Sequence, residues 1–485
     1  MADKSAGLLE ERSYDYVPTN ERSGNLRSQT QLWFMINASF LTAATGALGP
    51  LSGLGLPWTI VAIISGSVFG TLFQAFHGAQ GPRMGLPQMI QSRAQFGSKG
   101  AVLPLAAATI VQFGFAIFYV QTGASSLGIV IPAAPIGILQ VLVGLAGLVV
   151  AAIGYKLVML AEKTVSYLMI ATLIVLTIGV IVLLPVGELL QHSEFVLAPF
   201  LLQFGAAATF QIAVAPVVSD YTRYLPVRTS GGAVSASVFF GTLVSAVWIE
   251  ILGAILALSF PKLDTVSGFA KLADNMLPGL SLPVMIVSLI TCLNAVAVCF
   301  YSGSVAFLAA VEGFRRFKST FKVRGLTIAI IGVLVIIASL IVPSGALGSF
   351  SVFLSILVYF LIPWTAVNLT DYYIVRRGVL SISDILKPDG GIYGRWGKAG
   401  MISYIVGFIV MIPFFSTTLW VGPAAKAIGG ADFSFFVGLI VSAGLYLILT
   451  RRFDRVANYD AVRATPINTI DAFDEPVEVV AGAQR

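Results

Sequence analysis

The sequence predicts an all-helical integral membrane protein with about twelve transmembrane helices. The first observation is composition: of the 485 residues, 57% are hydrophobic and only 11% are charged, and the mean hydropathy is +0.90. A soluble domain carries about 25% charged residues, so composition outweighs the soluble domains that length alone would suggest. The second observation is a series of twelve apolar segments. The third is the distribution of Lys and Arg among the loops that join them.

Each apolar segment is long enough to cross a hydrocarbon core about 30 Å thick. The segments must be helical, because lipid offers an exposed backbone no hydrogen-bond partner. The predicted spans are 31–54, 57–77, 101–127, 134–154, 163–185, 196–217, 234–258, 282–310, 325–343, 349–375, 400–420 and 431–450. Residues 1–30 lack the apolar core of a signal peptide. They and residues 451–485 are predicted to be polar, solvated tails on the cytoplasmic side.

The basic residues predict the orientation. If the N-terminus is cytoplasmic, all but three of the 29 Lys and Arg residues lie in the two tails and in the loops on that same side. The exceptions are Lys262, Lys271 and Lys426. This asymmetry follows the positive-inside rule, and removing one helix would destroy it. We therefore predict a multi-pass protein of the cell (inner or plasma) membrane with both termini in the cytoplasm. The net charge of +6 reflects basic loops and indicates no nucleic-acid partner.

Two of the predicted helices are interrupted. The first span carries polar and small residues at mid-depth, among them Asn37 and Ser39, and the sixth contains Gln211 and Pro216. These spans are the corresponding members of two five-helix halves. Paired interruptions at equivalent positions are the best sequence indication of the binding site of an inverted-repeat transporter.

Two polar segments are more specific. Residues 78–97, after the second span, read GAQGPRMGLPQMIQSRAQFG, and residues 363–378, ending the tenth span, read PWTAVNLTDYYIVRRG. Both resemble signatures of the nucleobase:cation symporter-1 family, the purine–cytosine permeases. The SDYTRY segment at 219–224 is similar to the cytosine/purine permease branch. The resemblance covers the first ten spans well and the last two by length and position only.

The resemblance implies the leucine-transporter fold. Residues 31–185 and 196–378 would form two inverted five-helix repeats, with two further helices within 400–450. It also implies a secondary symporter, not an enzyme, that imports a nucleobase or related flat heterocycle by alternating access. The coupling ion, H⁺ or Na⁺, stays open, as does the choice among cytosine, a purine, uracil or an allantoin-like compound. No cofactor is implied, and we expect the protein to act as a monomer in the lipid bilayer.

A flat heterocycle needs aromatic or apolar faces above and below it, and donors and acceptors around its edge. The third span offers Gln112, Phe115 and Tyr119 on one helical face, with Phe118 nearby. In the family this helix supplies a stacking aromatic residue, often Trp, and an amide. This chain has no Trp there, so Phe115, Phe118 or Tyr119 would have to stack. The alternative is an aromatic stripe that only packs.

The sixth and eighth spans supply further amides. Gln211 stands where relatives place a stacking aromatic residue, with Phe210 beside it. A neutral amide at mid-depth is unfavourable unless paired, so Gln211 is either a ligand contact or a partner of freed backbone. Relatives carry asparagines where this chain has Val296 and Val298, which leaves Asn294 as a candidate or as a bond between helices. The predicted substrate set is Ser39, Thr42, Gln112, Phe115, Phe118, Tyr119, Phe210, Gln211 and Asn294.

For the cation, the resemblance suggests main-chain carbonyls of the first span near Asn37, Ala38 and Phe40, with the Thr291 hydroxyl from the eighth span. Sodium needs such a cluster of hard oxygens. The second hydroxyl that relatives often show beside Thr291 is Ile290 here. A complete sodium site is therefore not indicated.

A proton is the alternative coupling ion. Glu250 is the one acidic residue well inside a predicted span, and ionisable residues at that depth mark proton and ion pathways. The other interpretation is a carboxyl group that faces the bundle and bonds to a hydroxyl or water. His77 lies at the inner end of the second span and His192 in an outer loop, and we predict surface or interface positions for both.

Charged residues also end the sixth and tenth spans on the cytoplasmic side. Asp220 is followed by Arg223, and Asp371 by Arg376. We predict that these are helix-end charges that form ion pairs at an inner gate and do not contact the substrate.

Other classes of protein are less compatible with the sequence. A channel usually repeats identical subunits around an axis, whereas this chain would fold its site internally. An intramembrane enzyme would need a nucleophile–base pair or a metal motif, and none is present. A carrier of the same fold for an amino acid or for a vitamin such as thiamine remains the alternative.

Overall fold

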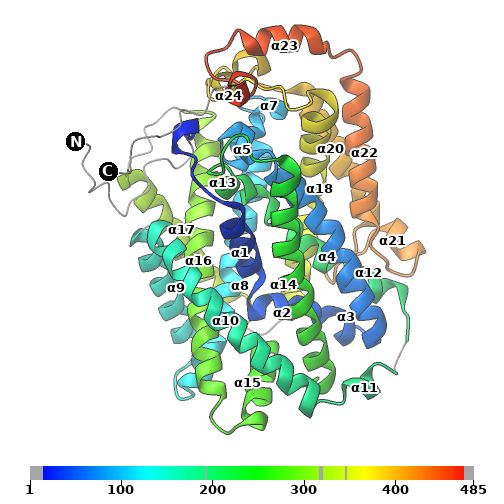
Figure 1. The fold of residues 1–485 in the computed structure, drawn as a ribbon. Coiled ribbons are helices and arrows are strands. Elements are labelled where there is room, and N and C mark those ends of the chain that lie inside the picture. The colour runs from blue at the N-terminus through cyan, green and yellow to red at the C-terminus, as the bar shows by residue number, and fades with distance from the viewer. Residues whose placement is uncertain (1–14, 154, 192–193, 316–320, 344–346, 475–485) are drawn as a thin grey trace, which may run out of the picture.

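The computed structural model describes residues 15–153, 155–191, 194–315, 321–343 and 347–474. Within these ranges every regular element is helical, and Figure 1 shows long helices lying side by side, with short ones at both ends. Among the residues that the structure describes, seven helices are long and apolar enough to cross a membrane, and four shorter apolar helices accompany them. The predicted all-helical membrane fold is confirmed, while the count of twelve crossings stays a prediction.

Most long helices follow the predicted spans, although the fifth begins earlier, at Tyr155, and the eleventh ends earlier, at Met411. The first half contains α1 (Leu26–Asn37), α2 (Phe40–Gly46), α3 (Leu48–Leu51), α4 (Leu56–Gly78), α8 (Val102–Val130), α9 (Ile136–Ile153) and α10 (Tyr155–Leu183). The second half contains α12 (Leu197–Ile212), α13 (Val218–Thr222), α14 (Gly231–Ser259), α16 (Ser281–Glu312), α17 (Phe321–Ile341) and α18 (Leu347–Leu369). Two further helices follow, α20 (Lys398–Met411) and α22 (Ser434–Leu449).

Short elements connect them. Between the long helices lie α5 (Gly81–Met84), α6 (Gln88–Gln91), α7 (Arg93–Phe96), α11 (Val186–Leu189), η2 (Ala215–Val217) and α15 (Thr265–Met276). After α18 come η3 (Thr370–Val375), α19 (Ile382–Ile385), η4 (Gly391–Tyr393), η5 (Ile412–Phe414), α21 (Pro423–Ala427), α23 (Arg455–Arg463) and α24 (Asp471–Asp474), while η1 (Thr19–Glu21) precedes α1. The predicted domain borders themselves stay predictions.

Both predicted interruptions are confirmed, and each has a local cause. Ser39 is extended (φ −144°, ψ 157°) and caps α2 by accepting a hydrogen bond from the Thr42 backbone N–H. A capping hydroxyl of this kind begins a new helix. In the sixth span Pro216 lies in the 3₁₀ turn η2 between α12 and α13, because proline has no N–H for the α-helical hydrogen bond.

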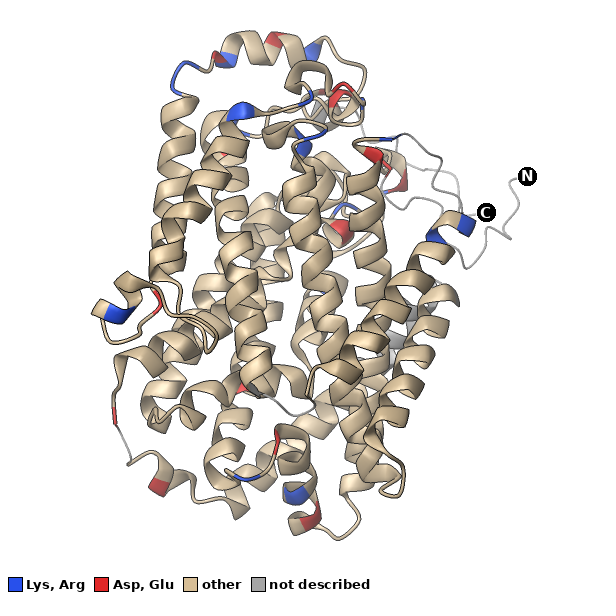
Figure 2. Ribbon diagram, turned by 180° about the vertical axis from the view of Figure 1, so that it is seen from behind, with Lys and Arg blue, Asp and Glu red and all other residues tan. Residues whose placement is uncertain are grey.

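The two ends of the molecule differ in charge. Figure 2 shows Lys and Arg gathered mainly around α23 and the loops beside it; we call this the polar end. Parts of the predicted solvated tails pack against this end instead. The Val17 backbone N–H donates to Gly85 O at 2.9 Å, and the Thr469 hydroxyl donates to Gly378 O at 2.8 Å. Such contacts between distant segments do not appear in local composition.

Candidate functional site

A cavity of about 90 Å³ lies where the two broken helices meet α8 and α16. It is small beside the ~300–1,000 Å³ of pockets that hold drug-sized ligands. From the predicted set, the cavity is lined by Ser39, Gln112, Phe115, Tyr119, Phe210, Thr291 and Asn294. Residues from four separate helices therefore converge at the level of the helix breaks.

Aromatic rings form one part of the cavity wall. Phe115 of α8 and Phe210 of α12 meet edge to face, with ring centroids 5.3 Å apart. Tyr119, one turn beyond Phe115, lies 6.3 Å from that ring. The helical spacing of 112, 115 and 119 places all three on the cavity, as their shared helix face requires. A planar ligand would meet ring surfaces here.

Amide groups supply the polar edge. Gln112 forms no hydrogen bond within the described part of the chain, and Asn294 Oδ1 has no partner. The nearby hydroxyls are already engaged, since Thr291 donates to Val287 O at 2.9 Å and the Ser39 hydroxyl is hydrogen-bonded to the Thr42 hydroxyl. The two amides therefore offer unused donors and acceptors to a ligand.

Several predicted residues lie outside this cavity. The Thr42 hydroxyl lies 3.1 Å from the Ser39 hydroxyl and stabilises the helix break. It does not line the cavity. Phe118 and Phe40 line a separate space of about 60 Å³.

Gln211 is fully buried, and neither polar atom of its side-chain amide has a partner among the described residues. Asn37 donates to Thr242 O at 3.3 Å, away from the cavity-lining set. Ala38, at the break, is also fully buried and is not among the cavity-lining residues.

Other cavity residues were not predicted from the sequence. Val298 and Cys299 of α16, Val217 and Tyr221 after the break in α12, and Val165 of α10 line the same space. Helical spacing from Thr291 and Asn294 through 298 could have indicated the α16 residues. Nothing comparable marked Val165.

A second group of buried polar side chains lies between α1, α2, α4, α12 and α14. Each carries at least one side-chain oxygen or nitrogen with no hydrogen-bond partner among the described residues, and each is at most 1% exposed. An unsatisfied buried group costs about 1–3 kcal/mol. We call this group the polar seam; it consists of Asn37, Thr45, Ser67, Thr71, Gln74, Gln211, Thr242 and Glu250.

A larger cavity of about 300 Å³ lies between α12, α18 and the segment before α22. Its acidic group, Asp432, already accepts hydrogen bonds from the Tyr359 hydroxyl at 2.6 Å and from the Ser416 backbone N–H at 3.1 Å. None of the predicted substrate residues lines this space, so we do not assign the site to it.

The two signature segments pack against each other at the polar end and do not line the cavity. The Gln80 side chain donates to Asn368 at 3.0 Å, and Trp364 donates to the Ser92 hydroxyl at 2.9 Å. His77, predicted at a surface or interface, is fully buried, and its ring stacks on Trp364 at 4.5 Å. His192 lies outside the described residues.

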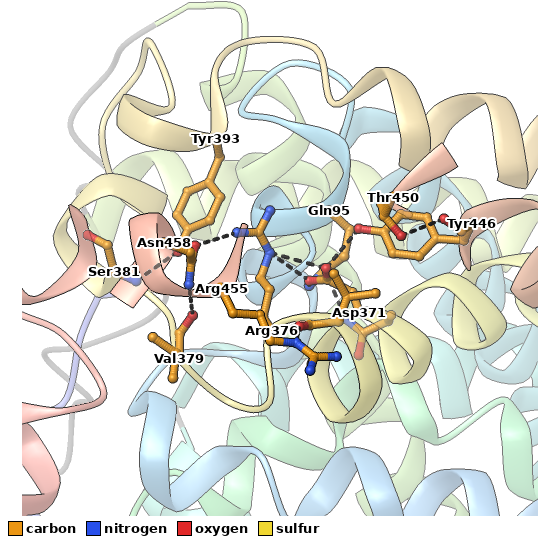
Figure 3. A network of polar contacts seen from close by, with 12 residues as sticks. Gln95, Asp371, Arg376, Val379, Ser381, Tyr393, Tyr446, Thr450, Arg455 and Asn458 are labelled. Atoms are coloured by element: carbon orange, nitrogen blue, oxygen red, sulfur yellow. Dashed lines mark hydrogen bonds and ion pairs between the residues drawn. The ribbon is translucent and has the colours of Figure 1, made fainter. Parts of the chain in front are cut away.

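Figure 3 shows the centre of this packing, the ion pair between Asp371 and Arg376 at 3.1 Å. Gln95 donates to the same carboxylate at 2.7 Å, and the Tyr446 hydroxyl donates at 2.8 Å. Arg376 in turn donates to Asn458 of α23. The predicted Asp371–Arg376 pair is therefore confirmed. At the end of α13, Asp220 accepts from the backbone N–H of Gln88, and Arg223 donates to Asp15 O.

Comparison with known proteins agrees with the resemblance in the signature segments. The family described as "Permease for cytosine/purines, uracil, thiamine, allantoin" matches residues 16–438. The chain belongs to this permease family. Among curated relatives, the permease is 34% identical over 457 residues to the putative purine-cytosine permease YxlA of Bacillus subtilis, covering 93% of this chain and 98% of that protein. It is 26% identical to purine-cytosine permease fcyB of Emericella nidulans, with 91% and 88% covered.

Solved structures agree with the fold. Mhp1, a nucleobase-cation-symport-1 family transporter, in a closed conformation with bromovinylhydantoin bound, gives a TM-score of 0.73 at 18% identity, covering 94% of this chain and all of that one. Its inward-facing conformation gives 0.74 at 18% identity, with 95% and 99% covered. A Na⁺-coupled sialic acid symporter gives 0.60 at 13% identity, with 92% and 93% covered. At these identities the likeness concerns the fold alone.

Proposed function

We propose that the permease is a secondary symporter that imports a planar, nitrogen-rich heterocycle of the purine or cytosine type together with a cation. It acts by alternating access, as a monomer in the cell membrane, with both termini in the cytoplasm, and without a catalytic step. The observation that carries this proposal is the small cavity at the two helix breaks, with ring surfaces and free amides on its wall. The purine–cytosine permeases among its relatives support the substrate class.

Recognition would divide between two kinds of contact. Phe115, Phe210 and Tyr119 would pack on the faces of the heterocycle, because aromatic rings favour stacked or edge-to-face contacts. Gln112 and Asn294 would read its edge, since each amide has both a donor and an acceptor. Neutral amides suit a neutral heterocycle, and no charged side chain is among the described residues that line the cavity.

The coupling ion is the less constrained part of the proposal. Thr291 and Ser39 lie on the cavity and could contribute oxygen ligands to sodium, but Ile290 occupies the place of a second hydroxyl. Glu250 is fully buried within α14 and supplies a group that can carry a proton. We therefore favour proton coupling.

Thermal-shift measurements test the substrate class. We expect cytosine, a purine, uracil or allantoin to raise the melting temperature of the purified protein, because a ligand that binds only the folded state stabilises it by about 2.7 kcal/mol at a hundredfold excess over Kd. Thiamine and amino acids are the comparison compounds. A shift with an amino acid and none with any heterocycle would contradict the proposal.

The two cysteines provide a direct probe of the cavity. Cys299 lines it, whereas Cys292 is fully buried and does not, and both are free. We expect a small thiol reagent to modify Cys299 and a bound heterocycle to slow that reaction. Mass spectrometry after labelling would locate the adduct. Cys299→Ser should remove the labelling and Cys292→Ser should leave it; the reverse pattern would show that the cavity is not the binding site.

A further inference from the structure

The polar seam contains atoms that the surrounding protein does not satisfy. Both carboxyl oxygens of Glu250 and both amide atoms of Gln74 and Gln211 lack partners, although all three side chains are fully buried. Buried polar groups in proteins are otherwise hydrogen-bonded to protein or to ordered water. A site with several polar partners is the kind that holds water. The mixture of hydroxyls, amides and a carboxyl group fits water as the ligand.

One end of the seam is fixed by the packing of α4 on α12. Two successive glycines of α4 lie against two successive turns of α12, and a Cβ at the second, Gly70, would lie 2.2 Å from Ala208 O. Gln74 follows Gly70 by one turn, and Gln211 follows Ala208 by three residues. The two amides therefore lie at the same level of this interface, near the break in the sixth span.

The other end is fixed by the packing of α2 on α14. A Cβ at Gly46 would lie 1.9 Å from Glu250 O, so the neighbouring residue Thr45 lies at the level of Glu250. Thr242 precedes Glu250 on α14. Its backbone carbonyl accepts a hydrogen bond from the Asn37 side chain of α1, and its hydroxyl has no partner among the described residues. Thr242 and Glu250 are eight residues apart on one helix, which is about 12 Å.

Helix α4 spans the distance between these ends. Ala75 faces α14, because its carbonyl accepts from the Ser235 hydroxyl at 3.0 Å. Thr71 and Ser67 precede Ala75 by one and two turns, and their hydroxyls lack partners. Because α4 packs on both α12 and α14, these hydroxyls lie between the level of Gln74 and that of Glu250. Beyond Gln74, the same helix ends in the polar network around His77.

No charged group faces Glu250 from the side chains that the structure describes in the helices packed against α14, which are α1, α2, α3, α4, α10 (side chains of 165 and 167–183 only), α11 and α15. Their titratable side chains are exposed, apart from His77, which bonds to Thr365 at 2.7 Å. These side chains are Arg27, His77, Tyr167, Glu188, Lys271 and Asp274. Glu250 therefore has no ion partner there, and exchange with water is the route by which its charge can change.

We propose that the polar seam binds water and carries protons between Glu250 and the polar end, on the side of the broken helices away from the heterocycle. Phe210 lines the cavity, whereas the adjacent Gln211 belongs to the seam, so α12 separates the two compartments. The Glu250 carboxylate takes a proton from hydronium, giving a neutral carboxyl group and water, and returns it during the transport cycle. This inference rests on the proposed symport function.

Proton entry into proteoliposomes tests the seam, with an internal pH dye and a heterocycle that shifts the melting temperature. Glu250→Gln should abolish heterocycle-driven proton entry. Thr71→Val should slow this entry about tenfold, because it removes one hydrogen-bonding group from the polar seam. Thr59→Val is the matched control, because Thr59 is equally buried on α4 but its hydroxyl bonds to Gly55 O at 3.0 Å. The control should behave as wild type, and all three variants should keep the ligand-induced shift.

Wild-type proton-to-heterocycle ratios in both Glu250→Gln and Thr71→Val would overturn the proposal, as would uptake that needs sodium and moves no protons.

Melting without ligand gives a separate test. In a dry seam, Thr71→Val would raise the melting temperature by removing an unpaired buried hydroxyl, and such a rise would also overturn the proposal. If no heterocycle binds the wild-type protein, the symport function fails, while this melting comparison still tests hydration.

Discussion

Gln112→Met and Asn294→Leu are each expected to weaken binding of the heterocycle by about 10–100-fold, the loss of one or two hydrogen bonds at a desolvated edge. Both amides lie on the cavity without a protein partner for the atoms that would read the ligand. Their removal therefore leaves no protein group newly unpaired, and the apo melting temperature should stay close to that of wild type. Thermal-shift titration of the purified variants measures both quantities.

Gln211→Met provides the comparison. It removes a fully buried amide from a position outside the cavity, so the titration should give a Kd close to the wild-type value. If Gln211→Met abolished binding while Gln112→Met did not, the heterocycle would have to lie on the seam side of α12.

Asp371→Asn is expected to cause the largest loss of stability. The Asp371 side chain is fully buried and pairs with Arg376, whose side chain is 14% exposed. Removing one partner from a buried ion pair destabilises a protein by about 3–5 kcal/mol, because the other charge is left uncompensated. We expect a large drop in the melting temperature, measured by the unfolding of detergent-solubilised protein.

An ion pair with one exposed partner, at the same end, supplies the comparison. Lys387 pairs with Asp384, and the Lys387 side chain is 52% exposed whereas that of Asp384 is 3% exposed. Because water reaches this pair from the Lys387 side and screens it, Lys387→Met should lower stability less than Asp371→Asn does. Combining Asp371→Asn with Arg376→Met should recover part of the loss, because both charges are then removed. An Asp371→Asn protein that melts like wild type would show that the pair does not hold the polar end together.

The placement of the signature segments changes how they are interpreted. They identify the family, yet their side chains bond to each other at the polar end and leave the cavity to other residues. Gln88 illustrates the arrangement: its side chain accepts from the Ser219 hydroxyl at 2.6 Å, and its backbone N–H donates to Asp220. These bonds join the loop after α4 to the segment after the sixth-span break. Alternating access would have to break or move them.

Periodicity and local chemistry predicted much of this structure. Apolar length gave the long helices, and the polar interruption at Ser39 and the proline at 216 gave the two breaks. The spacing of Gln112, Phe115 and Tyr119 placed one helix face on the cavity without any long-range information. These features depend on residues close together in the chain, which is why sequence alone could indicate them.

Features that depend on distant contacts were not accessible in the same way. Gln211 lies next to a helix break, and a shift of one residue along α12 decides whether a side chain points into the cavity or into the polar seam. The direction of the Gln211 side chain could therefore not be deduced from its polarity at mid-depth. The burial of His77 depends on Trp364, far along the chain. The packed segments at residues 15–25 and 455–474 look polar locally and are held by backbone bonds to remote loops.

The most direct test is an experimental structure of the permease with the heterocycle that gives the largest thermal shift. We expect ligand density between α8, α12 and α16, with ring contacts to Phe115 or Phe210 and with the amides of Gln112 and Asn294 within hydrogen-bond distance of the ligand's edge. Density in the space beside Asp432, or an empty central cavity under saturating ligand, would contradict this expectation.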